Sequence, residues 1–140
     1  MKTSLWGALA LAVLAAAPAA AQDAAAGERV FSQCMACHQI TDAAGTVIRR
    51  GGAVGPNLYG VAGRAAAAAE GFRYGPGIVA AAEKGLVWDA ETFVAYLADP
   101  NAFMQEFTGD SGARSNMPFR LPNATDAANV YAYLESVAGN

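Results

Sequence analysis

Apolar residues recur at helical spacing near the carboxyl end of the chain. Thr125 is a short polar residue of the kind that accepts a hydrogen bond at the start of a helix. The apolar positions that follow it are Val130, Tyr133, Leu134 and Val137. Because these positions share one face of a helix, the pattern predicts a carboxyl-terminal helix that has Thr125 as its N-cap and packs against a core.

A second helix is predicted at residues 89–98. Asp89 is the expected N-cap, and the helix is expected to end before Pro100 because proline restricts the residue that precedes it. The apolar face of this helix consists of Phe93, Tyr96 and Leu97. Residues on either side of the chain's two cysteines show no convincing strand pattern, so the pattern favours helices joined by loops.

The amino-terminal 21 residues have the pattern of a secretory signal peptide. Lys2 supplies the positive start, residues 5–17 form an apolar run, and a small-residue cleavage site ends at Ala21. The apolar run is shorter than the ~20 residues that a spanning helix needs, which disfavours an uncleaved membrane anchor. We therefore expect a secreted, soluble domain of residues 22–140.

Composition limits the kinds of partner that such a domain can have. Loss of Lys2 leaves 8 Arg and Lys residues against 12 Asp and Glu, a formal charge of −4. This balance argues against nucleic acid, whose phosphates need concentrated positive charge. The remaining 119 residues form one small domain whose core is marginal without help, and a bound cofactor would provide that help.

The chemistry is concentrated in Cys34-Met35-Ala36-Cys37-His38, which matches C-x-x-C-H, the pattern for covalent haem attachment. Each thiol can add to one vinyl group of the porphyrin, and the two-residue gap in a helical turn brings the two sulfurs to both vinyls. His38 then lies under the ring and is predicted to bind iron. The sequence thus predicts one haem c.

Three other interpretations of the cysteines are less favoured. A thioredoxin-like dithiol belongs to a βαβ context that the flanking sequence lacks. A structural zinc site needs four ligands, and two Cys with one His do not supply them without carboxylates. A disulfide in an oxidising compartment is possible but leaves His38 without a role.

The sixth iron ligand is narrowed by elimination among the other side chains. His38 is the only histidine, which excludes two histidine ligands and leaves the methionines. Met1 leaves with the signal peptide, and Met35 between the attached cysteines does not reach the opposite face of the ring. Of the remaining two, Met117 is preferred over Met104, because Pro118 stiffens the backbone that follows Met117.

The order of these features resembles the class I cytochromes c, including bacterial cytochrome c2 and mitochondrial cytochrome c, over residues 27–137. The resemblance implies an all-α cytochrome c fold of three main helices, with short helices and loops around the haem. Residues 27–31 are similar to the first helix of the family, in which a small Gly27 lets the terminal helices cross. Residues 55–60 resemble the segment in which Pro56 accepts a hydrogen bond from the proximal histidine, here His38.

The resemblance also assigns roles to four other residues. Arg64, Tyr74 and Trp88 align with positions that donate hydrogen bonds to the haem propionates. Tyr96 resembles the tyrosine whose hydroxyl approaches the methionine sulfur and tunes the iron potential. For each of these side chains, ordinary core packing is the alternative.

The chain departs from the family pattern in the length of one loop and in its cations, among other differences. Residues 101–116 are longer than in mitochondrial relatives and are expected to form an inserted surface loop. Lys84 is the only lysine after the signal peptide, whereas relatives commonly surround the haem edge with lysines that steer docking. The cations left to form a sparse positive rim are Arg49, Arg50, Arg114 and Arg120.

With both axial positions filled, we expect a monomeric electron carrier and not an enzyme. The resemblance implies a periplasmic shuttle from a cytochrome bc1 complex to a terminal oxidase or a photosynthetic reaction centre. The alternative is a dedicated electron acceptor for one periplasmic dehydrogenase, which the scarcity of lysine favours somewhat. A third class of function, that of a peroxidase or a gas sensor, requires that the sixth coordination position of the iron opens to small molecules.

Overall fold

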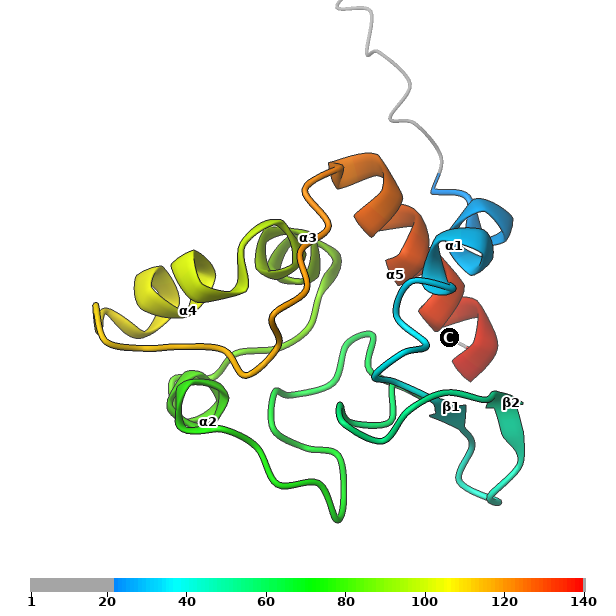
Figure 1. Cartoon of the computed structure of the whole chain (residues 1–140), viewed down its shortest axis with the longest axis horizontal. Helices are drawn as coiled ribbons and strands as arrows, with labels where there is room; N and C mark the ends of the chain where they lie inside the picture. Colours follow the sequence, from blue (N-terminus) through cyan, green and yellow to red (C-terminus); the bar gives the residue numbers. More distant parts are fainter. Residues whose placement is uncertain (1–21, 140) are drawn as a thin grey trace, which may run out of the picture.

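The computed structural model describes residues 22–139 (Figure 1). In sequence order, these residues form the elements α1 (Ala24–Phe31), β1 (Ile40–Thr41), β2 (Val47–Arg49), α2 (Pro76–Glu83), α3 (Ala90–Ala98), α4 (Pro100–Thr108) and α5 (Ala124–Ala138). The prediction of a helical fold with long loops is confirmed. The predicted signal peptide lies outside the described residues, and no helix within them is long and apolar enough to cross a membrane.

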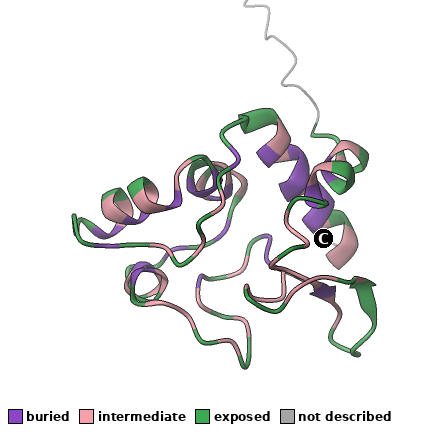
Figure 2. Ribbon diagram, viewed as in Figure 1, coloured by how far each residue is buried: buried purple, intermediate pink, exposed green. Residues whose placement is uncertain are grey.

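Helices α1 and α5 come from opposite ends of the domain and pack side by side (Figure 1). A Cβ added to Gly27 would lie 1.9 Å from the carbonyl oxygen of Asn129, so only glycine permits this approach. The rings of Phe31 and Tyr133 lie 5.5 Å apart in the same contact. The backbone N–H of Asp23 donates to Asn129 Oδ1 at 2.9 Å. Buried residues therefore concentrate along α5 (Figure 2).

Helix α3 packs against α5 and has the predicted cap and face. Asp89 is the N-cap and accepts a hydrogen bond from the Thr92 backbone N–H at 2.8 Å. The buried residues of α3 are Phe93, Tyr96 and Leu97, as predicted. The Phe93 ring lies 5.3 Å from the ring of Tyr131 in α5.

Helix α4 occupies half of the segment that was predicted to be a loop. Asp99 ends α3, and its side chain accepts the Ala102 N–H at 3.1 Å, so the same residue caps α4. Pro100 starts α4, because the first helical position needs no N–H donor. The loop prediction is therefore wrong for residues 101–108, where Met104 is fully buried in the core.

Helix α5 has a different N-cap from the predicted one. Asn123 Oδ1 accepts the backbone N–H groups of Thr125 and Asp126, at 3.0 and 3.2 Å. Thr125 thus lies in the first turn of α5, and its prediction as the N-cap is wrong. Asn123 lies earlier in the chain, where one side-chain oxygen reaches two free amides.

A short hairpin follows the cysteine motif. Strands β1 and β2 pair antiparallel, and Val47 and Ile48 of β2 are exposed. Strands of two and three residues are too short to show an alternating pattern, so sequence analysis predicts no strands here. The Asn57 side chain bonds both the N–H and the carbonyl of Thr41, at 3.0 and 2.7 Å, and so fastens the hairpin to the next loop.

We expect Gly27→Ala to lower the free energy of unfolding by about 3 kcal/mol, because its Cβ meets backbone and not a movable side chain. Denaturant unfolding followed by circular dichroism measures this change. Gly112→Ala is the matched control, since its Cβ would meet only the Asp110 side chain, at 3.2 Å. A cost for Gly27→Ala no larger than that of the control would contradict the packing described for α1 and α5.

Candidate haem site

The C-x-x-C-H segment forms a helical turn that continues from α1. The N–H of Cys34 donates to the Phe31 carbonyl at 2.8 Å. The N–H groups of Cys37 and His38 both donate to the carbonyl of Cys34, at 3.1 and 2.9 Å. This turn fixes the spacing of the two cysteines, and α1 fixes the position of the turn in the fold.

The Cys34 thiol does not have the character of a reactive redox thiol. Both cysteines are free and partly buried. Burial, with a smaller effect from Cys37, raises the pKa of the Cys34 thiol to about 11. Reactive dithiols have lowered thiol pKa values, so this environment disfavours the thioredoxin-like interpretation.

His38 is held in the tautomer that an iron ligand needs. Its Nδ1 lies 2.7 Å from the carbonyl oxygen of Pro56, the partner expected from the family resemblance. The carbonyl accepts the Nδ1–H and leaves the Nε2 lone pair available to a metal. Burial lowers the pKa of His38, with an opposing effect from this hydrogen bond, which favours the neutral imidazole.

Glycines let the following loop approach the attachment turn closely. A Cβ on Gly55 would lie 2.3 Å from His38 Cε1, and one on Gly51 would lie 1.8 Å from the His38 carbonyl oxygen. The Gly55 N–H donates to the carbonyl of Cys37 at 2.8 Å. Sequence analysis did not identify Gly51 or Gly55 as neighbours of His38, because this contact depends on the tertiary structure.

Arg64 and Trp88 are brought together by backbone pairing between their segments. The Gly63 N–H donates to the Trp88 carbonyl at 2.8 Å, and the Trp88 N–H donates to the Arg64 carbonyl at 2.9 Å. The Trp88 side chain is buried, and its ring lies 5.0 Å from the ring of Tyr96. The Tyr74 hydroxyl instead accepts the backbone N–H of Ala69 at 3.1 Å.

The guanidinium of Arg64 has hydrogen-bond acceptors in the described residues for only some of its N–H groups. Its Nη1 and Nη2 donate to the carbonyls of Tyr59 and Asn57, at 2.9 and 3.3 Å. Its Nε is buried and has no hydrogen-bond partner among the described residues. Such a donor needs an acceptor, and a haem propionate is a carboxylate of the required kind. Arg64 therefore fits a haem in this site.

The two candidate methionines lie in different environments. Met104 is fully buried within α4, surrounded by the hydrophobic core. Met117 is partly buried in the loop between α4 and α5, and its backbone N–H donates to Ser115 Oγ at 3.0 Å. A loop methionine can present its sulfur to a cofactor without opening the core, so this difference favours Met117.

The Tyr96 hydroxyl lies 2.6 Å from Ser115 Oγ, two residues before Met117. Burial raises the pKa of Tyr96, against a smaller opposing effect from Ser115, so the hydroxyl stays protonated. The expectation from the resemblance was a contact with the methionine sulfur, whereas the bond in this structure is to Ser115. Sequence reasoning missed Ser115, because the bond depends on how α3 and the loop pack.

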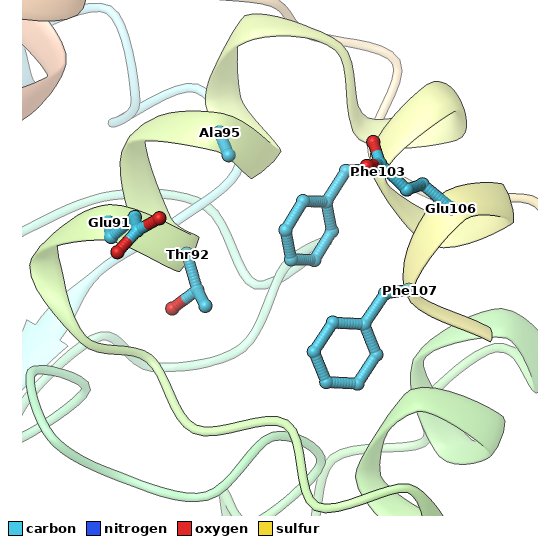
Figure 3. A pocket seen from close by; sticks show the side chains of 6 residues that line it. All are labelled: Glu91, Thr92, Ala95, Phe103, Glu106 and Phe107. Carbon is cyan, nitrogen blue, oxygen red and sulfur yellow. The ribbon is translucent and has the colours of Figure 1, made fainter.

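A separate hollow of about 240 Å³ lies between α3 and α4 (Figure 3). Its lining residues are Glu91, Thr92, Ala95, Phe103, Glu106 and Phe107. The stacked rings of Phe103 and Phe107 form one side of it. None of the predicted site residues lines this hollow, and it is smaller than the ~300–1,000 Å³ typical of ligand pockets.

Comparison with known proteins tests the family resemblance independently of the site geometry. No protein-family model matches the chain. Cytochrome c2 of Cereibacter sphaeroides is 47% identical over 142 aligned positions, which cover 99% of this chain and 98% of the relative. Cytochrome c-550 of Paracoccus denitrificans is 46% identical over 138 positions, covering 96% of this chain and 87% of the relative. The X-ray structure of cytochrome c2 from Rhodobacter sphaeroides matches with a TM-score of 0.81 and 48% identity, covering 83% of this chain and 96% of that one.

The relatives agree with this chain over nearly its full length, and Cys34 and Cys37 stand at the haem attachment motif. The structural match extends the agreement to the described fold. The resemblance inferred from the sequence is thereby confirmed. The chain belongs to the class I cytochromes c, in the cytochrome c2 group, and is an electron-transfer protein with one covalently bound haem c.

Proposed function

We propose that the protein carries single electrons in the periplasm, with Cys34 and Cys37 as the haem attachment sites and His38 and Met117 as the iron ligands. When bound, the haem supplies reversible one-electron chemistry. The observation that carries this proposal is the state of His38, whose Nδ1 is bonded to Pro56 so that Nε2 is free for iron. Together with a loop methionine, this histidine leaves no axial position for a substrate, so we propose that the protein is not an enzyme.

The other site residues are proposed to hold the haem carboxylates and the ligand loop. The buried Nε of Arg64 supports a bond to a propionate, and Trp88 lies in the adjoining segment. Tyr74 supports this role less directly, since its hydroxyl accepts a backbone N–H and keeps its own proton for a second acceptor. Tyr96 acts on the Met117 loop through Ser115.

The proposed partners are membrane redox complexes. A cytochrome bc1 complex would supply the electron, and a terminal oxidase or a reaction centre would accept it. The second candidate is a dedicated acceptor for a periplasmic dehydrogenase. It is favoured because, among the described residues, few of the rim arginines have an unpaired charge that could steer docking to an acidic membrane complex. Which of these complexes exchanges electrons rapidly with the purified protein distinguishes the two.

Two of the four rim arginines are paired with carboxylates of the protein. Arg49 pairs with Glu28 and donates to the Tyr133 hydroxyl. Arg120 pairs with Asp99 at 3.2 Å. Arg114 donates to the carbonyls of Ser111 and Ala113, which hold its side chain in place but do not neutralise its charge. Arg50 is exposed and makes no hydrogen bond or ion pair with the described residues. Positive charge available for long-range steering is thus sparse.

We expect Met117→Ala to abolish the sulfur-to-iron charge-transfer absorption band of the ferric protein, because the sixth ligand is lost. Met104→Ala should keep that band and instead lower the free energy of unfolding by about 2–5 kcal/mol, since it leaves a cavity in the core. Absorption spectra and denaturant unfolding of both holoproteins measure these effects. Loss of the band in Met104→Ala alone would overturn the ligand assignment.

The rate of electron transfer to an acidic membrane complex is expected to depend weakly on salt. Between low and physiological ionic strength we expect less than about a 3-fold change in the second-order rate constant, where strong steering gives 10-fold or more. Stopped-flow oxidation of the reduced protein over a range of salt concentrations measures it. A steep fall with added salt would show instead that a positive docking face operates.

Cleavage of the signal peptide after Ala21 is expected to leave a chain that begins at Gln22. Intact-mass spectrometry of protein isolated from the periplasm should give the mass of residues 22–140 plus one haem. Recovery of the full 140-residue mass in the membrane fraction would exclude this assignment.

A further inference from the structure

The loop that carries Met117 is hydrogen-bonded to α4 through a side chain to which the family resemblance assigns no role. Asn101 lies in the first turn of α4, and its Oδ1 accepts the backbone N–H of Ser115 at 2.9 Å. Ser115 Oγ accepts the N–H of Met117 and is bonded to the Tyr96 hydroxyl. Asn101, Ser115 and Met117 therefore form one continuous chain of contacts from α4 to the proposed ligand.

Asn101 is itself well placed to hold the loop. It follows Pro100, whose ring fixes the start of α4, and Asp99, whose side chain caps the helix. Two residues further on, Phe103 stacks against Trp88 with ring centroids 6.4 Å apart. The backbone position of Asn101 is thus fixed by a capped helix that packs on the core.

The rest of the loop adds few strong ties to α4. Gln105 Nε2 donates to the Ala113 carbonyl at 3.4 Å, near the limit of a hydrogen bond. On its other side the loop packs closely on α2, where a Cβ at Gly77 would lie 2.1 Å from the Arg114 carbonyl oxygen. Close packing confines the loop, whereas the bond from Asn101 fixes the backbone at Ser115, two residues before Met117.

We propose that Asn101 is a positioning residue for the distal ligand: it braces the Met117 loop against α4 and thereby sets how often the sixth iron position opens to small molecules. The proposal rests on the proposed ligation by Met117. Opening of the loop requires breaking the Asn101–Ser115 bond, because the acceptor belongs to the helix and the donor belongs to the loop. Loss of this bond therefore favours the open state.

The test is the binding of imidazole to the ferric holoprotein, followed by stopped-flow loss of the sulfur-to-iron charge-transfer band. At saturating imidazole the rate reports opening of the loop. Asn101→Ala should raise this limiting rate about 5-fold, the factor expected for loss of one ordinary hydrogen bond from the closed state. An unchanged limiting rate in Asn101→Ala overturns the proposal.

Two variants serve as matched controls. Asn101→Asp keeps an oxygen at the same place near a helix amino terminus, where a negative charge is tolerated, and should bind imidazole within about 2-fold of the unaltered protein. Glu106→Gln changes an exposed residue of the same helix and should also stay within about 2-fold. If Asn101→Asp opens as fast as Asn101→Ala, the acceptor oxygen is not the cause and the proposal fails.

Hydrogen exchange of the unaltered ferrous holoprotein gives a second test that needs no variant. The Ser115 amide should exchange at least about 10-fold more slowly than that of Asn116, which has no acceptor among the described residues. Equal exchange at the two amides overturns the brace even if Asn101→Ala does not fold. A charge-transfer band absent from the unaltered protein would instead refute ligation by Met117, so the two failures are distinguishable.

Discussion

At the crossing of α1 and α5, the backbone of Gly27 touches the backbone of Asn129 so closely that no side chain fits between them. The attachment turn continues directly from α1, so this crossing sets where the cysteines and His38 lie. From α5, the Tyr131 hydroxyl donates to the Trp88 carbonyl at 3.1 Å and extends the same frame to the segment proposed to hold the propionates. One close helix contact thus aligns two sides of the site that are far apart in sequence.

The two proposed axial sides of the site differ in how their loops are held. On the His38 side, glycines and backbone hydrogen bonds pack the loop directly against the attachment turn. On the Met117 side, the loop backbone also packs closely on Gly77 of α2, but side-chain bonds of Ser115 to Tyr96 and of Asn101 to Ser115 hold the segment just before Met117. Backbone packing is hard to loosen without unfolding, whereas single side-chain bonds open more readily. These side-chain bonds next to Met117 therefore make the methionine side the more adjustable of the two.

The haem c cofactor could be predicted from the sequence because C-x-x-C-H is a specific pattern, and the single histidine limits the candidates for the iron ligands. The bounds of α3 followed from Asp89 and the apolar face. Tertiary context decided the rest. Pro100 predicts only the end of one helix, although it also starts α4 behind the Asp99 cap, and Asn123, of similar chemistry to Thr125, is the actual cap of α5. The bonds of Ser115 and the engagement of Arg49 and Arg120 leave no local pattern, since their partners lie far along the chain.

Because Asp99 both ends α3 and caps α4, the corner between these helices contains no spare residue. An inserted residue there would detach the cap from one of the helices and shift Met104 relative to the core. Residues 109–112 differ, since Gly109 ends α4 in a left-handed conformation and the turn after it is exposed. This turn can therefore accept added residues without moving either helix cap, which makes it the natural place beside the proposed distal ligand for a label or a grafted recognition sequence.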